Sequence, residues 1–200
     1  MSNLQNLLDE SRLISQKNIT HYDQNAISYD EGTQGHDVSQ NINALLRAIK
    51  TKPPFNILDF GCGPGRDLQT FTKLGHIATG LEGSQQAAQI ARTKSSCEVL
   101  VQDFFNLYLP ENAFDGIFAN ASLFHVPNHL LPKVLGDLWA CLKPNGILFS
   151  SNPRGNNEES WYGDRFGSYH DLAGWRSFMT HAKFTEIEHY YRPSGLPIEQ

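Results

Sequence analysis

Short apolar segments alternate with helix-forming segments through the middle of the chain, and this alternation restricts the fold more than any other feature. The apolar segments are the predicted strands, at 55–60, 76–81, 98–102, 113–120 and 146–151. Helices are predicted between most of them, at 67–74, 84–94 and 129–142. Strands joined by helical connections form a parallel sheet with right-handed crossovers. The strands are almost continuously apolar, which is typical of a sheet that is covered on both faces.

We therefore predict an α/β fold, a Rossmann-like three-layer sandwich with a mostly parallel sheet and helices on both faces. The whole chain is expected to be one domain, 1–200. It would comprise a helical N-terminal cover, a core, a long loop or lid beside the site, and a final helix and strand: 1–50, 51–151, 152–170 and 171–192.

Charge and cysteine usage exclude several classes of protein. The chain has 16 Lys and Arg against 21 Asp and Glu, a net charge of −5, whereas nucleic-acid binders usually carry a basic surplus. Cys62, Cys97 and Cys141 form no CxxC pair, so we expect reduced thiols and a cytoplasmic protein. The N-terminal sequence does not resemble a signal peptide, and no apolar stretch is long enough for a membrane span.

The segment 57–67, ILDFGCGPGRD, is a strand that runs into a glycine-rich loop. In this type of fold, ligands bind beyond the carboxyl ends of the strands. A dinucleotide site favours GxGxxG, whose backbone N–H groups bind a pyrophosphate, but Pro64 has no N–H. The Asp59 carboxylate would repel a pyrophosphate and attract an ammonium group. The loop therefore favours a ligand with a cationic end over a nicotinamide dinucleotide.

Residues at the ends of the second and third strands describe the rest of the ligand. Glu82 follows the second strand, where a carboxylate can bind both hydroxyls of a ribose. Asp103 and Phe104 follow the third strand, where they suit the exocyclic amine and the face of an adenine. An adenine, a ribose and a cationic amino-acid end without phosphate describe S-adenosylmethionine.

Ordered motifs in the chain resemble the class I S-adenosylmethionine-dependent methyltransferases. The motifs are LDFGCGPG, GLEGS, QDFFN, AFDGIFANASLFHV and LKPNGILFSS, and the resemblance extends over residues 20–190. It implies S-adenosylmethionine as the cofactor, with the methionine end at the glycine loop, the ribose at Glu82 and the adenine at Asp103. The cofactor-binding residues it implies are Asp59, Gly61, Cys62, Gly63, Glu82, Gly83, Ser84, Asp103, Phe104, Asn120 and Tyr22.

Structural roles are the alternative for two of these acids. Asp59 would then pair with a basic residue such as Arg66, and Glu82 would only cap the helix that follows it.

The chain departs from the family pattern at two places. Asn145-Gly146 stands where the family usually has Gly-Gly, and because Asn tolerates a positive φ the turn is expected to form. The family sheet usually closes with an antiparallel hairpin, but after a predicted last strand at 184–191 only RPSGLPIEQ remains. We expect either a sheet without its seventh strand or a chain shorter than its natural gene, with an exposed sheet edge.

Methyl transfer from a sulfonium is an in-line displacement in which the protein supplies position and electrostatics. A general base is needed only if the acceptor must lose a proton. His125, which follows the fourth strand, is the candidate base or substrate ligand, and packing of the loop is its alternative role. Tyr22 is a candidate for cation–π attraction to the sulfonium, against ordinary aromatic packing. His125 and His129 lack a third ligand, so no metal site is expected.

Substrate specificity is expected from the N-terminal cover and from the loop at 152–170. The candidate residues are Tyr29, Arg154, Tyr162, Arg165, Tyr169 and His170. An arginine with aromatic side chains suits a small carboxylated or aromatic acceptor, and a solvated loop with aromatic anchors is the alternative. The sequence ANASLF replaces the Asn-Pro-Pro-aromatic motif of enzymes that methylate nucleic-acid and protein nitrogens. We predict a small-molecule acceptor and leave O, N and S open as the methylated atom.

Two other functions compete with methyl transfer. One is a non-catalytic methyltransferase-fold module with a binding or regulatory role, although such modules often lose the glycine loop or the ribose acid that this chain keeps. The other is a nicotinamide oxidoreductase, which Pro64, Asp59 and Asp103 disfavour. The sequence indicates no particular oligomeric state.

Overall fold

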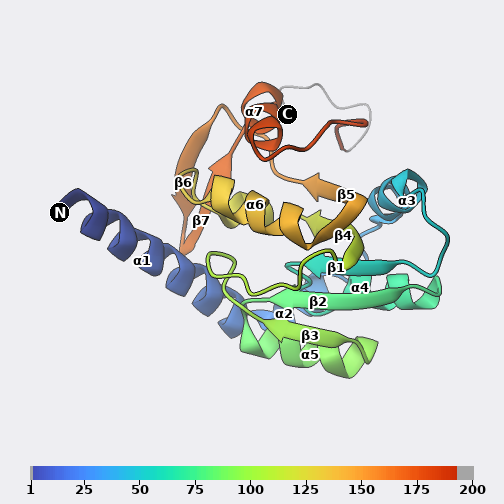
Figure 1. Cartoon of the computed structure of the whole chain (residues 1–200). Helices are drawn as coiled ribbons and strands as arrows, with labels where there is room; N and C mark the ends of the chain where they lie inside the picture. The colour runs from blue at the N-terminus through green and yellow to red at the C-terminus, as the bar shows by residue number, and fades with distance from the viewer. Residues whose placement is uncertain (1, 193–200) are drawn as a thin grey trace.

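The computed structural model describes residues 2–192 of the chain, and its centre is a parallel β-sheet (Figure 1). Five strands lie in the order β3-β2-β1-β4-β5. Their bounds are β1 Asn56–Phe60, β2 Ile77–Glu82, β3 Glu98–Val101, β4 Phe114–Asn120 and β5 Leu142–Ser151. Every adjacent pair is parallel. The predicted strands and the mostly parallel sheet are confirmed.

Helices cover both faces of this sheet, as predicted. They are α1 Ser2–Gln24, α2 Ala26–Thr33, α3 Ser39–Ala48, α4 Arg66–Lys73, α5 Gln85–Ser95, α6 Leu131–Cys141 and α7 Leu172–His181, with a short 3-10 helix η1 at Leu123–His125. On one face, apolar residues of α3, α4 and α5 pack with Ile57 and Phe118. On the other face, residues of α6, with α7 against them, pack with Leu58 and Ile117. Adjacent residues of one strand point to opposite faces, which is why these strands are apolar throughout.

Two local predictions in the core are confirmed. The Ser84 side chain accepts a hydrogen bond from the backbone N–H of Ala87 at 3.0 Å and caps α5. Asn145 adopts a φ of 63° at the turn within β5, where glycine and asparagine are the residues that tolerate such a conformation.

The prediction of a loop at 152–170 is wrong, because most of this segment is an antiparallel hairpin. β6 (Glu158–Tyr162) pairs with β7 (Arg165–Tyr169). The two-residue connection contains Gly163 with a φ of 62°. A glycine at the first position of a two-residue turn, between segments rich in aromatic residues, is a hairpin signal that the sequence carried.

The prediction of a last strand at 184–191 is also wrong. This segment has no strand partner, and side chains hold it instead. Glu186 accepts two hydrogen bonds from Arg176 at 2.6 and 2.7 Å, and Tyr190 donates one to Asn41 at 3.0 Å. Within residues 2–192, β5 pairs only with β4, so its other edge is open. The remaining sequence on which the prediction of a missing seventh strand depended lies, apart from Arg192, outside the described residues.

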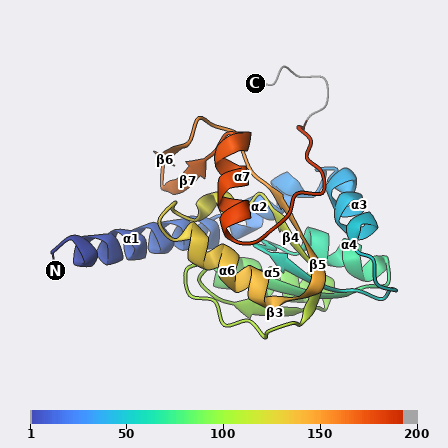
Figure 2. The same ribbon diagram turned by 45° about the horizontal axis from the view of Figure 1, so that its top comes forward.

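The first helix, α1, has 23 residues and extends beyond the rest of the fold (Figure 1). Its N-terminal half projects away from the sheet, and its C-terminal half runs beside the β6-β7 hairpin and α5 (Figures 1 and 2). Its Ile14 is 2% exposed and belongs to the core. In the described part of the chain, no helix is both long and apolar enough to cross a membrane.

Candidate functional site

A cavity of about 200 Å³ lies at the carboxyl ends of the central strands, beneath α1 and α2. Most of the residues predicted to bind a cofactor line it: Tyr22, Gly61, Cys62, Gly63, Glu82, Gly83, Asp103, Phe104 and Asn120. Asp59 and Ser84 do not line it. The sheet therefore brings together residues that lie up to about sixty positions apart in the sequence, from Gly61 to Asn120, as expected for parallel strands whose carboxyl ends share one edge.

The glycine-rich loop approaches its neighbours too closely for a side chain. Gly61 and Gly63 have φ values of 76° and 51°, a region that favours glycine. A Cβ atom at Gly61 would lie 2.5 Å from the Cβ of Ser122 and 3.2 Å from the Phe104 ring. The loop can therefore lie against the cavity only because position 61 has no side chain.

Glu82 connects this loop to the start of α5. One carboxylate oxygen accepts a hydrogen bond from Gly63 N–H and the other from Ser84 N–H, each at 2.9 Å. Burial raises the pKa of Glu82, and the backbone donors oppose that shift. Glu82 does more than cap the helix that follows it, because one of these hydrogen bonds comes from the glycine loop. Each carboxylate oxygen can accept a further bond, so a diol at the cavity has two acceptors.

Asp59 is buried beneath the loop and does not reach the cavity. It is 2% exposed, and its Oδ2 has no hydrogen-bond partner within the described chain. Burial raises its pKa well above the usual range, the Asp67 carboxylate adds to this, and Arg66 opposes it. The ion pair considered for Asp59 is not formed, because the Arg66 guanidinium binds both oxygens of Asp67 at 2.8 Å. Contact of Asp59 with a cofactor stays a prediction.

Asp103 is positioned by its own turn and by α1. One oxygen accepts from Phe105 N–H at 2.9 Å, and the other accepts from the Ser15 hydroxyl at 2.7 Å. The Phe104 ring packs on Phe60, with ring centroids 4.4 Å apart. An aromatic ring and a carboxylate thus line the same cavity, and their contact with an adenine stays a prediction.

Tyr22 and His125 form a hydrogen-bonded pair at the cavity. His125 Nδ1 lies 2.8 Å from the Phe166 carbonyl oxygen, so Nδ1 carries the proton and donates. Its Nε2 lies 2.8 Å from the Tyr22 hydroxyl, which therefore donates to it. Burial lowers the pKa of His125 to about 4 and raises the pKa of Tyr22 to about 12. Both groups are uncharged at neutral pH, so the pair orients a hydroxyl and is a weak base.

Polar residues of α1 that the sequence analysis did not single out hold the cover in place. Asn18 accepts from Phe166 N–H at 2.8 Å. Asp23 accepts from the Ser84 hydroxyl at 2.8 Å and from Gln86 N–H at 2.9 Å. Ser15, Asn18 and Tyr22 follow one another at helical spacing, which is the signal in the sequence that these side chains share one face.

The predicted substrate residues fall into separate places. Tyr29 lines the cavity, with its ring centroid 5.5 Å from that of Tyr22. The Arg165 side chain is hydrogen-bonded to Tyr22 and opposes the rise in the pKa of the tyrosine that burial causes. Tyr162 is 73% exposed on the hairpin, and Tyr169 packs beside Phe124, with centroids 6.1 Å apart.

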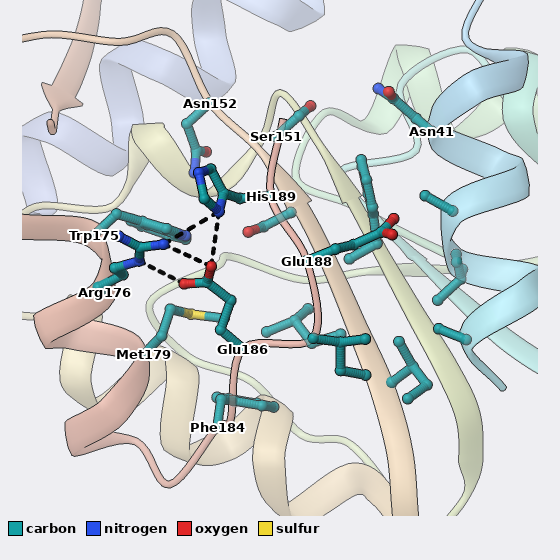
Figure 3. A pocket seen from close by; sticks show the side chains of 18 of the residues that line it. Asn41, Ser151, Asn152, Trp175, Arg176, Met179, Phe184, Glu186, Glu188 and His189 are labelled. Atoms are coloured by element: carbon teal, nitrogen blue, oxygen red, sulfur yellow. Dashed lines mark hydrogen bonds and ion pairs between the residues drawn. The ribbon is translucent and has the colours of Figure 1, made fainter. Parts of the chain in front are cut away.

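Arg154 and His170 line instead a larger, open cleft of about 2490 Å³ beside β5. Its walls are α3, β5, α7 and the segment 184–192, and it meets the smaller cavity at Val38 and Ala121. Arg176 and His189 both bind Glu186 inside it (Figure 3). None of the predicted cofactor residues lines this cleft, so we assign the functional site to the smaller cavity.

Replacement of His125 by asparagine is expected to flatten the acid side of the stability profile. Its pKa is about 4 in the folded chain against an ordinary value of 6.5. Between these values the unfolded state binds more protons, so the free energy of unfolding falls as the pH falls. This histidine should remove about 2 kcal/mol from the wild type between pH 7 and pH 5, a loss that urea unfolding of the variant should lack.

The control for that measurement is His181→Asn, which removes an exposed histidine of α7. It should keep the wild-type dependence on pH. An identical acid loss in the wild type and in His125→Asn would contradict the assignment of a neutral, buried His125.

The chain is similar to known methyltransferases in sequence and in fold. A family described as a methyltransferase domain matches residues 57–146. Trans-aconitate 2-methyltransferase from Enterobacter sp. (strain 638) is 36% identical over 121 residues, which cover 58% of this chain and 46% of the relative. Ubiquinone biosynthesis O-methyltransferase from Histophilus somni (strain 2336) is 32% identical over 105 residues, which cover 48% of this chain and 43% of the relative.

Among solved structures, the fold is similar to 1,6-didemethyltoxoflavin-N1-methyltransferase of Burkholderia thailandensis, crystallised with 1,6-didemethyltoxoflavin and S-adenosylhomocysteine. The TM-score is 0.70 at 20% identity, over 90% of this chain and 80% of the other. This likeness concerns the fold alone. The matched region spans less than half the length of the curated relatives.

Proposed function

From the membership of this chain in the class I S-adenosylmethionine-dependent methyltransferases, we propose that it transfers the methyl group of S-adenosylmethionine to a small-molecule acceptor. The observation that carries the proposal is the position of Glu82. Its buried carboxylate faces the cavity and holds the glycine loop through Gly63 N–H. A ribose fits this arrangement, because its two hydroxyls can donate to the two oxygens.

The remaining lining residues fit the other parts of the cofactor. Asp103 offers a carboxylate to the adenine amine, with the Phe104 ring beside the base. The loop at Gly61 and Gly63 leaves room for the methionine end. Within the described residues no lysine lines the cavity, the Arg66 guanidinium is bound to Asp67 and Pro64 has no N–H, which disfavours a pyrophosphate.

When bound, S-adenosylmethionine supplies the electrophilic methyl group, and the residues of this chain supply position. α1 and α2 cover the cavity and keep water from the reacting atoms. The Tyr22 hydroxyl donates to His125 Nε2 and accepts from the Arg165 side chain, so its ring is fixed. A ring held there also favours a neighbouring sulfonium through cation–π attraction.

A small acceptor is supported by the relatives. Their printed names are trans-aconitate 2-methyltransferase and ubiquinone biosynthesis O-methyltransferase. We therefore extend small-molecule methylation to this chain. A non-catalytic module with the same fold is the competing function.

Calorimetric titration of the purified chain with S-adenosylmethionine, S-adenosylhomocysteine and NAD tests the proposed cofactor. We expect saturable binding of both sulfur ligands, because Glu82 and Asp103 match the nucleoside that they share, and no binding of NAD. Absence of both sulfur ligands from the folded protein would contradict the proposal. Binding without turnover across a broad panel of small acceptors would favour the non-catalytic module.

A further inference from the structure

One cation beside the cavity has no counterion within the described residues. Four carboxylates line the cavity: Asp30, Asp67, Glu82 and Asp103. Each has a partner, since two form ion pairs with basic side chains and two accept backbone or hydroxyl hydrogen bonds. Arg165 does not line the cavity but reaches Tyr22, which does. Within residues 2–192 its guanidinium forms no ion pair.

The backbone beside Arg165 is fixed against the site. The next residue, Phe166, donates its N–H to Asn18 at 2.8 Å and accepts from His125 Nδ1 at 2.8 Å. Its side chain is 6% exposed. The start of β7 is thus bound to the cover helix and to the candidate catalytic histidine, so the Arg165 side chain begins from a rigid point.

The guanidinium of Arg165 lies next to the groups at which methyl transfer is proposed. Its carbon is 5.6 Å from the ring centroid of Tyr162, which pairs with it across the hairpin. Burial raises the pKa of Tyr22, and a hydrogen bond from the Arg165 side chain opposes this shift. Burial lowers the pKa of His125 and His21, and the charge of Arg165 adds to both shifts. Arg165 therefore places beside the Tyr22 hydroxyl a positive charge that forms no ion pair within residues 2–192, in a region where Tyr22 and His125 are neutral.

We propose that Arg165 binds a carboxylate of the methyl acceptor, which makes the acceptor a small carboxylic acid. This inference rests on the proposed function and narrows its substrate class. A guanidinium presents two parallel N–H groups that match the two oxygens of a carboxylate. A carboxylate suits the site better than a phosphate. A single guanidinium offers one pair of parallel N–H groups, which is enough for the two oxygens of a carboxylate, whereas a phosphate has further oxygens that would need a lysine or a cluster of backbone N–H groups.

Titration with matched anionic and neutral probes tests this inference. Benzoate, succinate and citrate are compared with benzamide and succinamide, with and without saturating S-adenosylhomocysteine. At least one carboxylate should bind the wild type, and its uncharged amide should bind at least about tenfold more weakly, because a charge-assisted hydrogen bond is lost. Arg165→Gln should weaken the binding of that carboxylate by a similar factor, and Arg165→Lys should weaken its binding less.

Arg12→Gln is the matched control, since its side chain is 77% exposed on the projecting part of α1. It removes the same charge and should leave carboxylate binding unchanged. Three results would overturn the inference: no binding of any of the carboxylates, equal affinity for the amides, or undiminished binding in folded Arg165→Gln. Inorganic phosphate that binds more tightly than every carboxylate would also overturn it.

The same titration separates this inference from the proposed function. Binding of S-adenosylhomocysteine to the wild type and to Arg165→Gln depends on Glu82 and Asp103 and should be alike. If S-adenosylhomocysteine binds but no carboxylate binding depends on Arg165, only the inference of a carboxylic acid acceptor is contradicted, and the proposed methyl transfer is not. Carboxylate binding without any binding of S-adenosylhomocysteine would leave an anion site and remove the methyltransferase function.

Discussion

Glu82→Ala is expected to weaken the binding of S-adenosylhomocysteine at least about 100-fold, because two charge-assisted hydrogen bonds to the ribose are lost together. The same change leaves Gly63 N–H and Ser84 N–H without their acceptor. The free energy of unfolding should therefore fall by about 2–4 kcal/mol. Calorimetry gives the first quantity and urea unfolding the second.

Two further variants separate the ribose contact from general damage. Glu82→Gln keeps one acceptor oxygen and most of the shape, so it should retain more stability than the alanine variant and still bind the cofactor weakly. Glu186→Ala removes an acid from the larger cleft, away from the smaller cavity, and should bind S-adenosylhomocysteine like the wild type. Wild-type affinity in a folded Glu82→Ala protein would show that this acid is only structural.

Gly61→Ala should damage both stability and cofactor binding. Alanine at a φ of 76° is strained by about 1–2 kcal/mol. The new Cβ would also meet the Cβ of Ser122 at 2.5 Å, and relief of such overpacking costs about 1–3 kcal/mol more. Because the loop lines the cavity, the shift that relieves this contact should weaken S-adenosylhomocysteine by about tenfold or more.

Gly75→Ala is a closely matched control for that experiment. Gly75 has a φ of 84°, but a Cβ there would have no atom within 4 Å. It should therefore show the backbone strain without the collision, and leave cofactor affinity unchanged. Equal effects of the two variants on stability and on affinity would mean that the close approach of the loop to Ser122 has no consequence.

The central sheet and its cavity were predictable because their signals are local. These strands are short apolar segments that end at an acid or an amide, as at Glu82 and Asn120, or run directly into a glycine, as at Gly61. Parallel strands share one edge at their carboxyl ends, so order along the chain was enough to bring these residues together. The asparagine turn at Asn145 and the cap at Ser84 were predictable for the same reason, since each depends on the conformation of one residue.

Other parts of the site depend on contacts between distant segments. The neutral state of His125 results from burial, which lowers its pKa more than the hydrogen bond to the carbonyl of Phe166, 41 positions away, raises it. The Arg66–Asp67 ion pair leaves Asp59 Oδ2 without a hydrogen-bond partner in the described part of the chain, and nothing near Asp59 in the sequence indicates this choice. Periodicity shows which residues share a face, but not which other segment will pack against that face.

The sequence by itself determined the parallel sheet, the glycine loop and the acids at the strand ends, because periodicity and residue type specify them locally. The tertiary structure decided that Asn18 and His125 hold the hairpin against the site, and so where Arg165 lies. It also decided that 184–191 forms no strand, because a strand requires a partner edge. Pairing and burial are relations between segments, and their energies depend on the whole packed chain.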